Sequence, residues 1–167
     1  MTICYVLENV LYINLTNRCT NRCTFCVRDK DCGIGDVNLW LEREPTVDEI
    51  IKDVDRFNPE KYKEVVFCGY GEPTMRLDDL LKVAKHIKEK YSVRTRINTN
   101  GQANLYFEED ITPKLKGLID CVSISLNAKN AKEYDELCLS DFGEDAFFGL
   151  IDFAKKCVEN GYYIAIG

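Results

Sequence analysis

The sequence has almost no histidine. Its single copy, His86, lies among Lys85, Lys88 and Glu89, a pattern typical of the solvated face of a helix. Histidine is the side chain that enzymes most often use as a general acid or base near neutral pH. One surface histidine therefore argues against a catalytic triad and against histidine-based proton transfer.

Long apolar runs and an excess of positive charge are also absent. No stretch approaches the roughly 20 apolar residues that a membrane-spanning helix needs, and the first residues lack the basic segment that opens a signal peptide. The 167 residues carry 22 basic and 28 acidic side chains, a net charge of -6. They therefore offer no broad basic surface for nucleic acids or anionic membranes. We expect a cytoplasmic protein with no membrane partner.

Cysteine, in contrast, is abundant. There are nine, an odd number that, without a secretion signal, indicates thiols rather than a disulfide framework. Cys19, Cys23 and Cys26 form a C-x3-C-x2-C pattern directly after the apolar run 11–16. Thiolates at this spacing can hold a polynuclear iron–sulfur cluster, and a four-iron cluster normally takes four cysteines. One iron would then lack a protein ligand, which suggests chemistry at that iron.

The alternative is a closed four-cysteine site in an electron-transfer or structural metal protein. Cys32 follows Cys26 by six residues, and Cys4 is also near in sequence, so each is a candidate fourth ligand. The remaining cysteines lie in strand or helix patterns and are expected to be small core side chains: Cys68, Cys121, Cys138 and Cys157.

Apolar periodicity predicts strands that alternate with helices. Strands are expected over 10–16, 64–68, 93–99, 121–126 and 162–166, and helices over 46–58, 77–91, 131–138 and 144–158, with a helical stretch over 104–119 that Pro113 interrupts. This alternation indicates an α/β fold with a mainly parallel sheet and right-handed crossovers. We expect one domain over residues 1–167 that ends at or just after the fifth strand.

The predicted strands have one apolar face and one polar face. Ser123 and Ser125 alternate with apolar residues in one strand, and Arg96 and Asn98 do so in another. If the apolar faces contact the helices, the polar faces line an interior that holds water or a polar ligand. Ligands of such folds bind at the carboxyl ends of the strands, where the cysteines and Asn127 are expected.

These residues resemble the radical S-adenosylmethionine (SAM) superfamily. Cys19, Cys23, Phe25 and Cys26 match its C-x3-C-x-aromatic-C motif, and residues 69–73, Gly-Tyr-Gly-Glu-Pro, are similar to its Gly-Gly-Glu-type turn. Residues 98–101 and 125–127 look like later segments that contact SAM. The phrases at 12–19 and 67–73 most resemble the TatD-associated group of the superfamily.

The resemblance implies a partial (βα)6 barrel with five strands visible in this chain. It also implies a [4Fe-4S] cluster that reductively cleaves SAM to a 5′-deoxyadenosyl radical, which abstracts hydrogen from an unidentified substrate. The partners would be a flavodoxin- or ferredoxin-type electron donor and, from the group resemblance, a TatD-type metal-dependent hydrolase. The cluster ligands would be Cys19, Cys23 and Cys26, and no other catalytic residue is expected.

The resemblance also assigns SAM contacts. Glu72 would accept hydrogen bonds from the methionine ammonium in a turn formed by Gly69, Tyr70 and Gly71, and Phe25 would pack near the adenine. The ribose and carboxylate would contact Asn98, Asn100, Ser125 and Asn127. On the same polar face, Arg96 and Asn14 are candidate substrate contacts, Arg96 as a partner for a carboxylate.

Overall fold

The computed structural model describes residues 1–29, 34 and 37–167. Six strands form one sheet in the order β1-β2-β3-β4-β5-β6. The strands are β1 (Cys4–Leu7), β2 (Val10–Ile13), β3 (Glu64–Phe67), β4 (Arg94–Thr99), β5 (Cys121–Ile124) and β6 (Tyr163–Ile166). Strands β2 to β6 pair in parallel and are the five predicted strands, so the mainly parallel α/β fold is confirmed.

Strand β1 was not predicted. It pairs antiparallel with β2 through a tight turn in which Glu8 and Asn9 have φ angles of 47° and 65°. Two-residue hairpin turns with positive φ at both positions usually contain glycine, and its absence removed the sequence signal for this hairpin.

The helices follow the predicted pattern closely. They are α1 (Val47–Phe57), α2 (Leu77–Lys90), α3 (Ala103–Phe107), α4 (Ala131–Cys138) and α5 (Asp145–Glu159), with short 3-10 turns η1 (Val27–Asp29), η2 (Pro59–Lys61), η3 (Pro73–Arg76) and η4 (Thr112–Leu115). Thr46 and Glu49 form the capping box that begins α1, and Asn58 ends the helix in the left-handed conformation. The helical stretch predicted over 104–119 is divided between α3 and η4.

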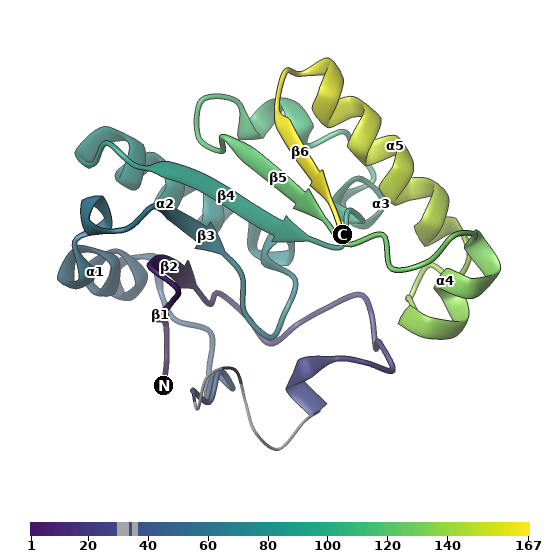
Figure 1. Ribbon diagram of the computed structural model, residues 1–167, viewed down its shortest axis with the longest axis horizontal. Coiled ribbons are helices and arrows are strands. Elements are labelled where there is room, and N and C mark those ends of the chain that lie inside the picture. The colour runs from purple at the N-terminus through teal and green to yellow at the C-terminus, as the bar shows by residue number, and fades with distance from the viewer. Residues whose placement is uncertain (30–33, 35–36) are drawn as a thin grey trace.

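The main core lies between the sheet and its helices. Alternate residues of the strands are fully buried and form one core with apolar residues of α1, α2 and α5; they include Leu11, Val65, Phe67 and Ile97. In Figure 1 the sheet crosses the molecule, α2 and α3 pass behind it, and the segment after β2 runs below the strand ends. The predicted apolar face therefore contacts the helices.

The opposite face is polar along β4 and β5 but aromatic along β1 and β2. Tyr5 and Tyr12 stack with ring centroids 5.1 Å apart. Tyr5, Leu39 and Tyr70 form a small second core there, and Leu39 is completely buried. The prediction of a polar interior face thus holds for only part of the sheet, because the segment around Leu39 covers the rest.

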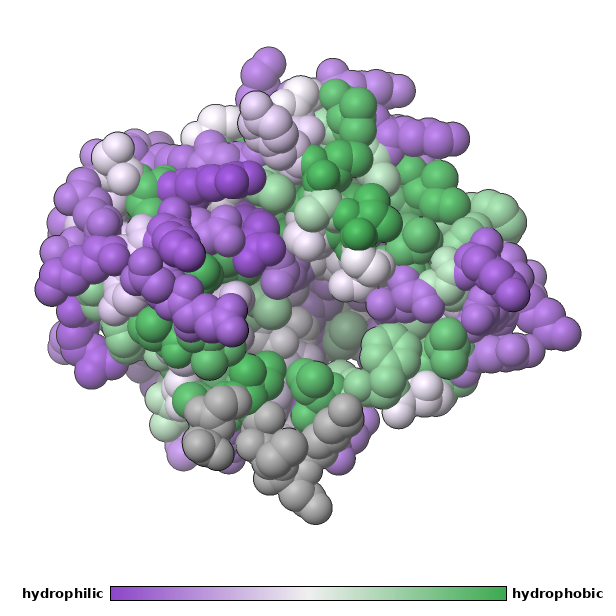
Figure 2. Space-filling model, in the orientation of Figure 1, coloured by the Kyte–Doolittle hydropathy of each residue, from purple (hydrophilic) through white to green (hydrophobic). Residues whose placement is uncertain are grey.

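The sheet is open rather than closed into a barrel. Beyond β6 no further strand pairs among the described residues, and Tyr163 and Ile166 are exposed. Figure 2 shows largely apolar surface over β6 and α5. In the described part of the chain, no helix combines the length and the hydrophobicity needed to cross a membrane.

Candidate functional site

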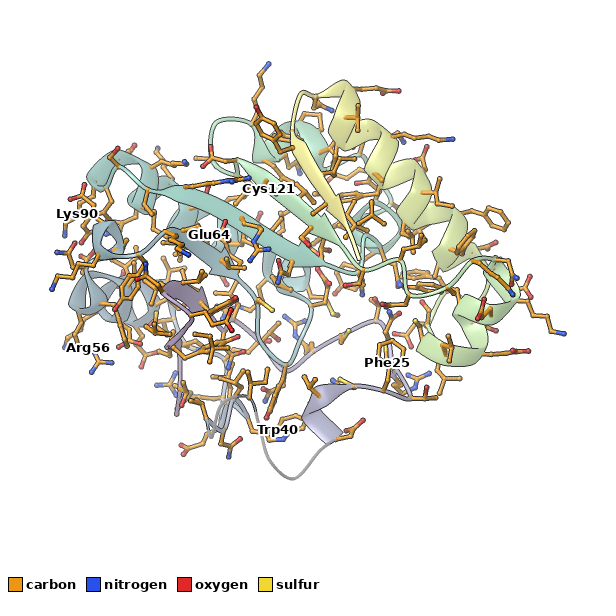
Figure 3. All side chains as sticks on the ribbon, viewed as in Figure 1. Phe25, Trp40, Arg56, Glu64, Lys90 and Cys121 are labelled. Atoms are coloured by element: carbon orange, nitrogen blue, oxygen red, sulfur yellow. The ribbon has the colours of Figure 1, made fainter. Side chains whose placement is uncertain are left out.

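The segment Cys19–Cys26 lies at the carboxyl ends of the strands and against the last turn of α4. The Arg22 amide donates to the Cys138 carbonyl at 2.9 Å, and the Thr24 amide donates to the Leu137 carbonyl at 2.9 Å. Phe25 projects from this segment near α4 (Figure 3) and is 45% exposed. The cysteine segment is thus fixed to an element more than 100 residues away in sequence.

The three thiols Cys19, Cys23 and Cys26 are free and partly exposed. Burial, together with the nearby Glu72 carboxylate, raises the pKa of Cys19 to about 11. Burial and the neighbouring Cys138 thiol raise the pKa of Cys23 to about 12. Metal ions displace such protons when they bind, so occupation of this site would be coupled to proton release.

The three thiols lie near one another but do not surround a single point. Cys19 and Cys26 each contribute to the raised pKa of Cys23, so the three sulfurs are electrostatic neighbours. Yet within the described residues no three cysteine, histidine or acidic side chains converge on a point that could hold one ion. In a polynuclear cluster each thiolate binds a different iron, so convergence is not required. Three cysteine thiols on one short segment are thus a donor set that fits a cluster.

The described structure gives no closed four-cysteine site. Cys4 is buried in the core, where burial and Asp53 raise the pKa of its thiol, and its amide bonds the Asp53 carboxylate. Cys32 lies outside the described residues. A different thiol, Cys138, is fully buried beside Cys23. Its burial, like that of Cys121 and Cys157, agrees with the expected core role.

The turn after β3 packs directly on the cysteine segment. A Cβ atom on Gly71 would lie 2.2 Å from the Thr16 carbonyl oxygen and 2.5 Å from that of Arg18. A Cβ atom on Gly69 would lie 2.0 Å from Asn14 Oδ1. The Glu72 amide also donates to the Arg18 carbonyl at 2.7 Å. Both glycines are therefore required for close approach, and neither has a positive φ angle.

The Glu72 carboxylate is buried and joins two strand ends. Its Oε1 accepts hydrogen bonds from the Thr74 amide and hydroxyl and from the Thr99 hydroxyl, at 2.6–3.1 Å. Its Oε2 accepts a hydrogen bond from the backbone amide of Asn100 at 2.7 Å. Burial raises the pKa of Glu72 above its usual value, and these hydrogen bonds oppose the rise. A ligand ammonium at Glu72 would have to share oxygens that already hold the loop after β4.

The predicted SAM contacts fall into two groups. Asn100 is buried and uses its side-chain amide within the protein, donating to the Thr20 hydroxyl at 2.9 Å and toward Cys19 Sγ at 3.9 Å. Asn98 has a buried Oδ1 that finds no hydrogen-bond partner in the described part of the chain. Ser125 and Asn127 are exposed next to the strand ends. The second group remains available to a ligand.

The two predicted substrate contacts each use part of their side chain within the protein. Asn14 is fully buried, and its amide donates to the Leu39 carbonyl at 2.7 Å and the Thr2 carbonyl at 3.2 Å. Asn14 thereby anchors the segment around Leu39. Within the described residues its Oδ1 is buried without a hydrogen-bond partner, so its role as a substrate contact stays a prediction. Arg96 Nη2 pairs with Glu64 at 3.1 Å, and its Nε is buried with no hydrogen-bond partner among residues 1–29, 34 and 37–167.

The prediction from sequence missed two residues at the site. Gln102 and Tyr134 are 1% and 0% exposed, and their polar atoms bond residues of the cysteine segment. Gln102 follows an Asn-Gly pair, which predicts a turn but gives no indication of where the next side chain points. Tyr134 has an ordinary helical spacing. Only the folded arrangement reveals their contacts.

An open α/β sheet with three ligand-type thiols after its first parallel strand defines a metal-dependent α/β protein. The family is now clear: residues 13–164 match the model of the Radical SAM superfamily, and the chain belongs to that superfamily. Its members are enzymes that use a [4Fe-4S] cluster and SAM. The resemblance inferred from the motifs is confirmed at this level, and the TatD-associated group is not shown.

Individual proteins agree with this assignment. The chain is 27% identical over 146 residues to a Methanocaldococcus jannaschii protein named "Putative glycyl-radical enzyme activating enzyme MJ1227", covering 87% of this chain and 55% of that protein. The structure of anSMEcpe with bound AdoMet has a TM-score of 0.57 at 18% identity, over 94% of this chain and 42% of the other. The HydG maturase of Carboxydothermus hydrogenoformans has a TM-score of 0.65 at 20% identity, over 95% and 35%.

The two structures support the fold, a partial barrel that is not closed. The chain spans about half the length of the M. jannaschii relative. The substrate and the partners of the whole protein are therefore matters for proposal.

Proposed function

We propose that this chain is the core of a radical SAM enzyme that binds a [4Fe-4S] cluster through Cys19, Cys23 and Cys26. The observation that carries the proposal is a set of three partly exposed thiols on one anchored segment, next to a turn with space only for glycine. When bound, the reduced cluster supplies the electron that splits SAM to methionine and a 5′-deoxyadenosyl radical, which takes hydrogen from a substrate. The substrate is unidentified.

The chain's own residues would orient SAM. Ser125 and Asn127, which are exposed, would bind ribose or carboxylate groups. Asn98 would do the same through its Oδ1, which has no hydrogen-bond partner among the described residues. Phe25, exposed beside the cysteines, would contact the adenine. Gly69, Tyr70, Gly71 and Glu72 would contribute through the backbone of their turn, because the Tyr70 and Glu72 side chains are buried in other contacts.

The substrate would lie over the polar face of β4. Arg96 forms an ion pair with Glu64 but has one buried nitrogen without a partner in the described structure. It would therefore recognise an anionic or mixed-charge group. Asn100 would act on the ligand indirectly, through Thr20 and Cys19.

We further propose a single cytoplasmic domain over residues 1–167 that receives electrons from a flavodoxin- or ferredoxin-type donor. The phrases at residues 12–19 and 67–73 support a place in the TatD-associated group, with a TatD-type metal-dependent hydrolase as a partner.

Anaerobic reconstitution tests the function. The protein should bind about four irons per chain, SAM should change the EPR spectrum of the reduced cluster, and dithionite with SAM should yield 5′-deoxyadenosine. Cys19→Ala should abolish product, whereas Cys157→Ala, a change in the helix core, should retain it. A stoichiometric zinc content with no response to SAM would contradict the proposal.

The same assay decides the alternative of a closed four-cysteine site. Cys32→Ala should leave the cluster and the SAM response intact. Loss of metal from Cys32→Ala would instead indicate an electron-transfer or structural site.

A further inference from the structure

We propose that Gln102 is a positioning residue that holds the cysteine segment in its cluster-binding form before any metal arrives. The inference rests on the proposed function, because it concerns the ligand loop of that site. The hydrogen bonds of the Gln102 side chain go to Thr20, Asn21, Tyr134 and Ser140, so its role would be exerted through the residues between Cys19 and Cys23.

The Gln102 side chain uses all of its hydrogen-bonding capacity. Its Oε1 accepts from the Thr20 hydroxyl at 2.8 Å and from the Ser140 hydroxyl at 2.9 Å. Its amide nitrogen donates to Asn21 Oδ1 at 2.8 Å and to the Tyr134 hydroxyl at 2.8 Å. Two acceptor sites and two donor hydrogens are thus matched by four different residues.

These four partners connect the cysteine segment to α4 and the turn after it. Thr20 and Asn21 are the two residues that follow Cys19, whereas Tyr134 is in α4 and Ser140 lies just beyond its end. Asn21 also donates to the Tyr134 hydroxyl at 3.1 Å, which closes a ring of hydrogen bonds with Gln102. The position of Cys19 relative to α4 is consequently set at one buried side chain.

A second chain of contacts joins this ring to the loop after β4. The Asn100 side-chain amide donates to the same Thr20 hydroxyl at 2.9 Å, and Asn100 Oδ1 accepts a hydrogen bond from the backbone amide of Gln102 at 3.0 Å. Gly101, between them, has a φ of +76° and would place a Cβ 2.9 Å from Leu150 Cβ. The backbone before Gln102 is therefore held tightly, and this fixes the point from which the Gln102 side chain extends.

Burial makes this ring sensitive to the loss of any member. Gln102 is 1% exposed, Tyr134 is 0% exposed, and Thr20 and Asn21 are 3% and 4% exposed. Buried polar groups that lose their partners cost far more than the hydrogen bond was worth, so a partly satisfied network tends to rearrange. Without Gln102, Thr20 and Asn21 would turn toward water, and Cys19 would move with them.

Hydrogen exchange on the metal-free protein tests the anchoring directly. The variant Gln102→Leu keeps the volume but removes all four bonds. The Arg22 and Thr24 amides, bonded to carbonyls of α4 in the native protein, should exchange about tenfold faster or more in this variant. Tyr134→Phe removes only the hydroxyl, should show a smaller change in the same direction, and provides the test if Gln102→Leu does not fold.

Thr95→Val is the matched control. Thr95 is fully buried at the opposite end of β4, and its hydroxyl donates to the Leu118 carbonyl at 2.7 Å. The control loses a hydrogen bond of a fully buried side chain on β4, the strand that precedes Gln102, but should leave exchange at Arg22 and Thr24 unchanged.

Reconstituted protein tests the consequence for the cluster. Gln102→Leu should release iron to a chelator about tenfold faster than Thr95→Val, and its cluster should have a shifted reduction potential, because hydrogen bonds and solvent near the sulfurs tune that potential. Equal exchange, equal iron release and equal potential in the two variants would overturn the inference. If the native protein binds no cluster, the proposed function fails instead, and the exchange rates alone decide whether Gln102 anchors the segment.

Discussion

Gly71 lies so close to the chain that leads into Cys19 that no side chain fits at its position. The two carbonyl oxygens nearest its missing Cβ, those of Thr16 and Arg18, are backbone atoms and cannot rotate away. A substitution must therefore separate the turn after β3 from the cysteine segment. The hydrogen bond from Glu72 to Arg18 would be strained by the same movement.

We expect Gly71→Ala to lower the free energy of unfolding by about 2–3 kcal/mol, the usual cost of forcing an extra methyl group into a packed site. The same variant should take up less iron on reconstitution. Urea denaturation and iron analysis measure the two effects. Gly117→Ala is the control, since Gly117 has a φ of +75° but open space around it, and should cost only about 1 kcal/mol. Equal losses in the two variants would show that close approach is unimportant.

Among single residues, those whose signal is local in sequence could be predicted, and those whose surroundings come from distant segments could not. The spacing of Cys19, Cys23 and Cys26 is local, so the sequence was sufficient to predict a metal site there. The burial of Asn14 was not predicted, because strand alternation fixes which face a side chain occupies but not which loop covers that face. In this protein the covering residue is Leu39, whose position depends on a distant tertiary contact.

Helices and strands could be predicted from the sequence where the residues that begin and end them are characteristic of helix or strand ends. Helix α1 begins and ends where its capping box and Asn58-Pro59 place it, whereas the hairpin of β1 had no glycine to mark its turn. The role of α4 in holding the cysteine segment could not be predicted from the sequence for a different reason. Its last carbonyls hold the cysteine segment across more than 100 residues, and a single sequence contains no record of such pairing.

Helices α1 and α2 are joined by one carboxylate, Asp55. It accepts hydrogen bonds from His86 at 2.8 Å, from Lys90 at 2.8 Å and from the Tyr91 hydroxyl at 2.7 Å. Partial burial raises the pKa of Asp55, but these hydrogen bonds outweigh it and lower the pKa from 3.8 to about 2. His86, the only histidine, therefore has a structural contact on the helix surface.

This contact should make stability depend on pH in acid. A lowered folded pKa contributes stability that is complete above 3.8 and is lost as the pH falls through about 2. After screening by solvent we expect about 1 kcal/mol. Asp55→Asn should be less stable by that amount at neutral pH and should show a flatter decline in acid, as measured by urea denaturation over a pH series. Glu89→Gln, in an exposed pair with Lys85, should match the native protein. A parallel acid decline in Asp55→Asn would refute the assignment.

Across the whole molecule, three separate elements hold the cysteine segment and the residue before it. The turn after β3 bonds Arg18, the loop after β4 bonds Thr20, and α4 bonds Arg22 and Thr24. A cluster on this segment would have ligands whose positions depend on all three elements. Because an unfolded chain does not present this arrangement, cluster binding should stabilise the entire fold rather than one loop.

The reconstituted protein should therefore unfold about 5–10 °C above the metal-free protein, in a single transition, as anaerobic calorimetry would record. Cys23→Ala should abolish this difference. Cys138→Ala is the informative comparison, because Cys138 is fully buried beside Cys23. It should lower both midpoints by opening a small cavity but keep the difference between them. If Cys138→Ala instead removed the difference, Cys138 would have to be a fourth ligand, and the iron available to SAM would not exist.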